Sequence, residues 1–250
     1  MLPKSLCICS SLITLVLNHC RLEKGFVIEW KSLNSLKLKY AKLDDDDIVN
    51  LLSGCPDLET LESSNVEGFS RLEIISSNLK RLKFEEYWFS DDEAYHSLGI
   101  IAPYIRYLEI SGNLYDLKCK LVNVSSVVSA KLTFQNCYTN FTRSISGKTY
   151  PDTHQVIRTL VQDYLQKLSY ATQLTIGTWL IEVLLQLEGL LLPELKCKCL
   201  TLDLHITRFS SKGVAILLQA SPYVETLNIT MATMTVTSCN FSSSYCTFIL

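Results

Sequence analysis

The sequence predicts an α/β solenoid in which short parallel strands form a concave sheet and helical or irregular segments return the chain along the convex side. Two observations lead to this prediction. Apolar residues, mostly leucine, recur in one short pattern at nearly regular intervals. Between several copies of the pattern the chain carries helix signals instead. With 48% hydrophobic residues in 250, there is enough apolar material for a continuous core.

The repeat is clearest over residues 12–20, which follow the pattern L-x-x-L-x-L-x-x-C, and over residues 33–43, which repeat it and add a further leucine. Seven weaker copies follow, and most of the starts are separated by 21 to 28 residues. Both the pattern and the spacing are typical of a leucine-rich repeat. Each unit alternates inward leucines with outward residues, so it is expected to be a short strand. The nine expected strands are centred near Leu15, Leu36, Leu61, Leu82, Leu108, Leu132, Leu174, Leu202 and Leu227.

Two of the return segments carry helix signals. Four aspartates at 44–47 precede an apolar segment that Gly54-Cys55-Pro56 closes, and Ser210-Ser211 precede one that ends at Ser221-Pro222. Aspartates at a helix start interact favourably with the helix dipole. A calcium or magnesium cluster is the alternative, but consecutive carboxylates point in different directions. We therefore interpret residues 44–47 as a helix start.

The domain boundaries follow from where the repeat is interrupted and where it stops. Residues 1–231 are expected to form one leucine-rich-repeat domain, and the interval of 42 residues before the seventh repeat holds an insertion. Its apolar residues have helical spacing, so a helix over about 151–168 is expected on the convex or flanking side, with partner binding as an open alternative. The apolar segment 179–192 contains Glu182 and Glu188 and is expected to be a buried part of the solenoid. Residues 232–250 lose the repeat and are expected to form a loosely ordered tail.

Composition excludes some partner classes. The net charge of −2 supplies no positive field for nucleic acid or anionic lipid, so neither partner is expected. The apolar run at residues 6–17 belongs to the first repeat rather than to a signal peptide, so the chain is expected inside the cell, in the cytoplasm, the nucleus or both. The ten cysteines show no disulfide or zinc spacing and are expected to be reduced thiols.

No constellation for catalysis is apparent, so we expect no enzyme activity, no cofactor and no metal. The four histidines are scattered, and the nine glycines form no phosphate-binding loop. Cys20 and Cys137 follow predicted strands, where a small polar side chain bonds the backbone of the turn. A hydrolase that uses a buried Cys and His is the competing interpretation.

The functional surface is then expected on the concave face, where the residues between the inward leucines meet solvent. In register, Lys37, Arg81 and Lys83 are expected to form a basic patch near Glu62, with Tyr107 as an aromatic anchor. The alternative is that these charges only keep a solvated sheet soluble. The candidate protein-binding residues are Lys37, Lys39, Glu62, Arg81, Lys83, Glu85, Tyr107, Glu109, Lys131, Asp203 and His205.

Several short motifs resemble those of a known family. They are Leu2-Pro-Lys-Ser-Leu6, the turns at residues 53–61 and 220–229, Leu174-Thr-Ile-Gly-Thr-Trp179, and Cys197-Lys-Cys-Leu-Thr-Leu-Asp-Leu-His205. Over residues 2–231 the chain resembles the plant family of F-box proteins with leucine-rich repeats and an FBD-type module. The resemblance implies a substrate receptor of a cullin-based ubiquitin ligase, whose F-box docks on a Skp-type adaptor while the repeats hold a target protein.

The chain departs from the family pattern at both ends, since the sequence shows neither an F-box before the repeats nor a complete FBD-type module after them. We therefore expect a Skp-type adaptor as a partner only if an upstream F-box exists. The alternatives are a stand-alone leucine-rich-repeat scaffold, a truncated gene product without ligase function, and the sensor repeats of an immune receptor.

Overall fold

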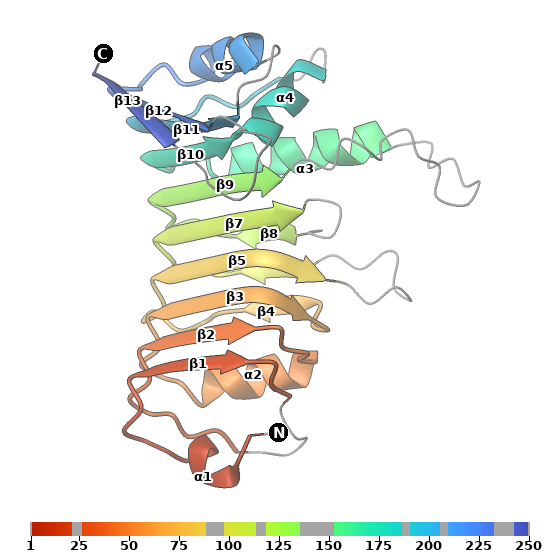
Figure 1. Ribbon diagram of the computed structural model, residues 1–250, viewed down its shortest axis with the longest axis vertical. Helices are drawn as coiled ribbons and strands as arrows, with labels where there is room; N and C mark the ends of the chain where they lie inside the picture. The colour runs from red at the N-terminus through yellow and green to blue at the C-terminus, as the bar shows by residue number, and fades with distance from the viewer. Residues whose placement is uncertain are drawn as a thin grey trace, which may run out of the picture. The chain divides into compact units, whose positions relative to one another are not determined.

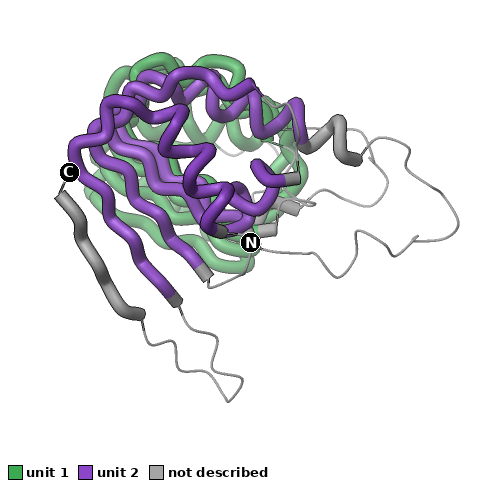
Figure 2. The backbone as a smooth tube through the Cα atoms, turned by 90° about the horizontal axis from the view of Figure 1, so that it is seen from above, with its two compact units in different colours: residues 1–127 green, residues 128–250 purple. Residues whose placement is uncertain are grey.

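The computed structural model describes residues 2–21, 27–88, 98–113, 119–135, 153–186, 191–205, 210–232 and 243–249. The chain divides into two compact units, residues 1–127 and 128–250 (Figure 2). In each unit, successive repeats contribute parallel strands to a sheet.

The main sheet of unit 1 contains five parallel strands in the order of the chain (Figure 1): β1 (Thr14–Asn18), β2 (Ser35–Lys39), β3 (Thr60–Glu67), β5 (Arg81–Trp88) and β7 (Tyr107–Asn113). Each strand includes one of the predicted centres, so the leucine pattern located all five. The repeat length accounts for the parallel direction, because each coil returns the chain to the same edge before the next strand begins.

The register turns the repeat pattern into rows of equivalent side chains. One row is Leu15, Leu36, Leu61, Leu82 and Leu108, each paired with the next across neighbouring strands. Leu36 is fully buried, whereas Leu15, on the strand at the end of the row, is partly exposed. Two residues further along each strand a second row of inward side chains follows, and together the rows form the core of the unit.

Unit 1 also contains two helices, α1 (Lys4–Cys7) and α2 (Asp45–Ser53), and α2 is the helix predicted from the four aspartates. Asp44 caps α2: its Oδ1 accepts a hydrogen bond from the Asp47 backbone at 2.8 Å, and Asp47 Oδ2 accepts one from the Asp44 backbone at 3.1 Å. This reciprocal arrangement is a capping box. Asp45 accepts a hydrogen bond from the backbone N–H of Ser70 at 2.8 Å, which ties the helix to the next coil.

A second parallel sheet, which the sequence reasoning missed, also belongs to unit 1. It consists of β4 (Arg71–Glu73), β6 (Leu98–Ile101) and β8 (Cys119–Asn123). The segments that contain these three strands return the chain between strands of the main sheet and were expected to be helical or irregular, whereas the structure shows them extended. Leu72, Ile100 and Leu121 pair in register and are fully buried.

Unit 2 contains the four remaining predicted strands, again parallel: β9 (Ser129–Gln135), β10 (Gln173–Gly177), β11 (Cys199–His205) and β12 (Thr226–Ala232). The predicted insertion helix is α3 (Thr153–Lys167), and α5 (Ser210–Gln219) begins at the predicted serines. The apolar segment after β10 forms α4 (Thr178–Gln186), a helix that is buried over most of its length.

Aromatic packing and one glycine hold the helices of unit 2 in place. Phe134 of β9 lies edge-on to Trp179 of α4, with 5.6 Å between ring centroids, and 6.0 Å from Tyr164 of α3. Gly213 lets α5 approach α4 closely, because a Cβ at this position would collide with the backbone carbonyl of Ile181.

The structure differs from the expected loose tail over part of its length. β13 (Ser243–Ile249) pairs antiparallel with β12 through seven residue pairs, and residues 233–242 lie outside the described part. Aromatic and β-branched residues such as Thr247, Phe248 and Ile249 favour an extended chain, which accounts for the strand. Its antiparallel direction means that β13 is not a further repeat coil.

Candidate protein-binding face

Four charged residues of unit 1 occupy a single row across the concave face. The register pairs Lys37 with Glu62, Glu62 with Lys83, and Lys83 with Glu109. Each follows directly after a buried leucine of the core row, so the side chains stand on the opposite face of the sheet. Positive and negative charges therefore alternate from β2 to β7.

Contacts along this row neutralise its lysines. Lys37 Nζ lies 2.7 Å from Glu62 Oε2, and this hydrogen bond raises the pKa of Lys37. Lys83 Nζ lies 3.4 Å from Glu109 Oε1 and 4.0 Å from a carboxylate oxygen of Glu85. Only 11% of the Glu109 side chain is exposed, compared with 33% for Glu62. The end of the row at β7 is therefore the more protected part.

The neighbouring row contains Thr60, Arg81 and Tyr107. The guanidinium carbon of Arg81 lies 5.4 Å from the centre of the Tyr107 ring, within the range of a cation–π interaction. The Tyr107 hydroxyl donates a hydrogen bond to Glu109 Oε2 at 2.7 Å. Burial and this bond to Glu109 raise the pKa of Tyr107 to about 12, so its phenol is a hydrogen-bond donor at neutral pH.

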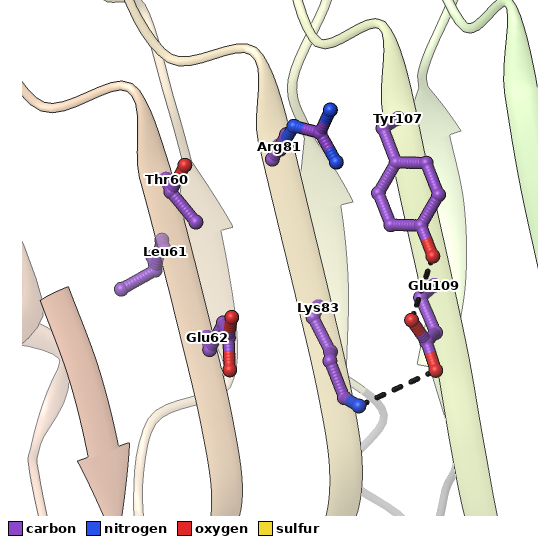
Figure 3. Close-up of a pocket in the computed structure, with 7 residues that line it drawn as sticks. All are labelled: Thr60, Leu61, Glu62, Arg81, Lys83, Tyr107 and Glu109. Atoms are coloured by element: carbon purple, nitrogen blue, oxygen red, sulfur yellow. Dashed lines mark hydrogen bonds and ion pairs between the residues drawn. The ribbon is translucent and has the colours of Figure 1, made fainter. Parts of the chain in front are cut away.

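The two rows enclose a hollow of about 210 Å³, lined by Thr60, Leu61, Glu62, Arg81, Lys83, Tyr107 and Glu109 (Figure 3). Five of these seven residues belong to the binding face predicted from the sequence. In the close-up, Arg81 points toward Tyr107, and Lys83 and Tyr107 both reach Glu109. The hollow therefore contains charged side chains that contact one another or the Tyr107 ring.

The expected basic patch requires correction. Arg81 lies in a different row from the two lysines, the row of Thr60 and Tyr107. Lys37 and Lys83 each lie beside a carboxylate. The same face is therefore an arrangement of alternating charges. Lys39 and Glu85 occupy the row that follows, each paired in register with Ser64 of β3.

Three of the predicted residues belong to unit 2. Lys131 shares a row with Thr175, which pairs with Thr201. Asp203 lies in a different row, paired with Gly177 and Thr230. The backbone of His205 pairs with Ala232 in β12, and its side chain is outside the described part.

An aromatic pair just past the strands was not predicted. His19, Tyr40 and Asn65 have positive φ angles of 51°, 48° and 53°. Each comes directly after the last residue of its strand in the pairing of β1 with β2 and of β2 with β3. The rings of His19 and Tyr40 are stacked, with centroids 4.6 Å apart. Aligning the first three repeats places the three residues at one position, which is the signal that could have revealed them.

The side chains that the structure describes form neither disulfides nor a cluster of metal ligands. The free thiols are those of Cys7, Cys9, Cys20, Cys55, Cys119, Cys197 and Cys199. The Cys20 thiol donates a hydrogen bond to the backbone carbonyl of Asn18 at 3.3 Å, as expected at a turn. Cys137 lies outside the described residues. Within the described ranges, no group of three or more metal-binding side chains comes together, and no helix is long and apolar enough to cross a membrane.

The parallel rows and their inward leucines define a leucine-rich-repeat protein. The chain belongs to the F-box/LRR family: the family described as the LRR repeats of the FBD-associated F-box protein At5g56370 matches residues 1–132. The family predicted from the sequence is thereby confirmed.

Relatives in Arabidopsis thaliana support the same family. The F-box/LRR-repeat protein At3g03360 is 30% identical over 245 residues, covering 91% of this chain and 46% of the relative. The F-box/LRR-repeat protein At5g02910 is 31% identical over 206 residues, covering 81% of this chain and 41% of the relative. The chain spans about half the length of the curated relatives it matches. No solved structure matches it.

Proposed function

We propose that this chain holds a target protein on its concave face, as the substrate-recognition repeats of an F-box receptor in a cullin-based ubiquitin ligase. Support for the ligase role comes from the relatives, which are named as F-box/LRR-repeat proteins. Support for the binding face comes from the hollow of unit 1. We place the function inside the cell, in the cytoplasm, the nucleus or both.

The observation that favours binding most is that Tyr107 is fixed between Arg81 and Glu109. Tyrosine and arginine are among the residues that most often dominate binding energy at protein interfaces. Binding usually has an entropic cost, because mobile side chains must be ordered. Here the contacts within the face already order them, so this cost is reduced.

A Skp-type adaptor is a partner only of a product that carries an F-box, because the adaptor docks on that module rather than on the repeats. A stand-alone scaffold without ligase function would use the same concave face for a target. The two functions therefore differ in whether the adaptor and ubiquitin transfer accompany the target.

Affinity capture with matched variants tests the binding role. Tyr107→Ala removes the ring and hydroxyl from the hollow, whereas Val49→Lys alters an exposed position on α2. We expect target proteins captured by the unmodified chain and by Val49→Lys to be lost with Tyr107→Ala. If no captured protein depends on Tyr107, the hollow of unit 1 is not the binding surface.

The ligase role has a separate test. The transcript that encodes this chain is sequenced at both ends, and its complete product is purified with a Skp-type adaptor. The receptor role predicts that the complete product carries an F-box, retains the adaptor and promotes ubiquitylation of the captured target. A complete product that binds the target but not the adaptor would instead be a scaffold.

A further inference from the structure

We propose that the hollow of unit 1 receives the carboxylate of an aspartate or glutamate side chain of the target, and that Arg81 is the residue that binds it. This inference rests on the proposed function and deepens it, since it names the chemical group recognised on the concave face. The inference rests on which charged side chains of the hollow already form ion pairs and which do not.

Both carboxylates of the hollow have partners on the same face. Glu62 pairs with Lys37 at 2.7 Å, and Glu109 accepts the Tyr107 hydroxyl at 2.7 Å and pairs with Lys83 at 3.4 Å. Arg81 differs from both lysines, because no carboxylate of the described residues forms an ion pair with its guanidinium. Among the charged side chains that line the hollow, Arg81 is therefore the one that no ion pair between described residues engages.

The exposed Arg81 side chain directs its guanidinium over the ring of one neighbour, Tyr107. Arg81 lies over the ring of Tyr107, and Tyr107 is held in turn by its bond to the largely buried Glu109 (Figure 3). A guanidinium plane positioned in this way presents two parallel N–H donors, which match the two oxygens of a carboxylate. Thr60, in register with Arg81, adds a hydroxyl to the wall of the hollow.

The charges of the hollow favour a carboxylate over the other groups that a protein can offer. A phosphorylated residue would bring close to two negative charges near Glu62 and Glu109, and among the described residues that line the hollow no second cation outside an ion pair would balance the second charge. A lysine or arginine of the target would meet Arg81 and Lys83, while the two glutamates are already neutralised. A single negative charge matches the single unpaired guanidinium.

Peptide selection tests the inference directly. A library of random peptides displayed on phage is selected against the full chain and against the variants Arg81→Gln and Arg106→Gln. Arg106 is the control, because it is an exposed arginine beside Tyr107 in sequence that does not line the hollow. We expect an acidic residue at one peptide position with the unmodified chain and with Arg106→Gln, and no such preference with Arg81→Gln.

One selected peptide is then synthesised with glutamate, glutamine or phosphoserine at the selected position, and binding is measured by fluorescence anisotropy. The change from glutamate to glutamine should weaken binding to the unmodified chain roughly tenfold to a hundredfold. With Arg81→Gln the two peptides should bind equally. Equal thermal unfolding of all variants shows that folding is not the cause.

Several outcomes would overturn the inference: an acidic preference that persists with Arg81→Gln, enrichment of basic residues, or tighter binding of the phosphoserine peptide than of the glutamate peptide. Its failure can be distinguished from failure of the proposed function. Peptides that need Tyr107 but show no acidic preference would overturn the carboxylate inference alone. Peptides whose binding depends on neither Tyr107 nor Arg81 would contradict both proposals.

Discussion

Lys37 of β2 and Glu62 of β3 face each other across neighbouring strands, with 2.7 Å between Nζ and Oε2. They are 25 residues apart in sequence, and one coil of the solenoid brings them together. The leucines that precede them, Leu36 and Leu61, pair in the same register and are buried. Core packing of the leucines therefore decides which charges meet on the concave face.

Replacement of Leu36 tests the core row. Leu36→Ala should lower the free energy of unfolding by about 2–5 kcal/mol, because it leaves a cavity at a fully buried position. Leu36→Asp should be more damaging, since it places an unpaired charge in the core. Leu15→Ala is the matched control. Leu15 belongs to the same row but is partly exposed, so its replacement should lower the free energy of unfolding by less. Urea unfolding measures these losses, and equal losses for the two alanine variants would contradict the different burial.

The Lys37–Glu62 ion pair should contribute little to stability. A double-mutant cycle with Lys37→Met and Glu62→Gln should give a coupling free energy of about 0.2–1 kcal/mol, which falls as salt is added, because both side chains are about one-third exposed. The Lys198–Glu225 pair, about two-thirds exposed, should show weaker coupling. A coupling that does not respond to salt would contradict an exposed ion pair.

Tyr107 should make the stability depend on pH in the alkaline range. Its folded pKa is raised from 10.0 to about 12, so between these values the folded chain holds a proton that the unfolded chain has lost. The contribution of Tyr107 to the free energy of unfolding is therefore complete below pH 10 and is lost as the pH rises toward 12. Tyr107→Phe should flatten this loss in denaturant unfolding. If tyrosinate absorbance shows that Tyr107 ionises near pH 10, the predicted environment is wrong.

Thiol labelling should separate the described cysteines by burial. Hydrogen bonding with Ser11 lowers the pKa of Cys9, whereas burial raises the pKa of Cys55 to about 12. Because the thiolate is the reactive form, Cys9 should react first with iodoacetamide at neutral pH, and Cys55 and Cys119 should stay protected until the chain unfolds. Mass spectrometry of labelled peptides measures the order. Early labelling of Cys119, which is completely buried, would contradict the packing of β8.

The leucine pattern predicted all nine repeat strands, because parallel coils place each copy of the pattern in the same surroundings. The second sheet of unit 1 could not be predicted in this way. β4 is three residues long with one buried side chain, Leu72, so its extended form depends on pairing with β6 rather than on a local pattern. The helical form of α4 was also missed, because a helix buried on most sides shows no alternation of apolar and polar faces.

The face of the candidate site could be predicted, but its contacts could not. The position of Lys37, Glu62, Lys83 and Glu109 directly after inward leucines was enough to place them on the concave side. Which cation meets which carboxylate depends on the exact register between coils of unequal length. For this reason the sequence suggested a basic patch, whereas the register pairs both lysines with glutamates and leaves Arg81 against Tyr107.

Site-specific photocrosslinking in cells tests the central claim, binding of a target protein on the concave face, most directly. A photoreactive amino acid replaces Thr60, which lines the hollow, or Val49, which is exposed on α2. We predict that the group at position 60 crosslinks a discrete target protein and that Tyr107→Ala abolishes this crosslink, while the group at position 49 gives none. Crosslinking of a target from position 49 and not from position 60 would contradict the claim.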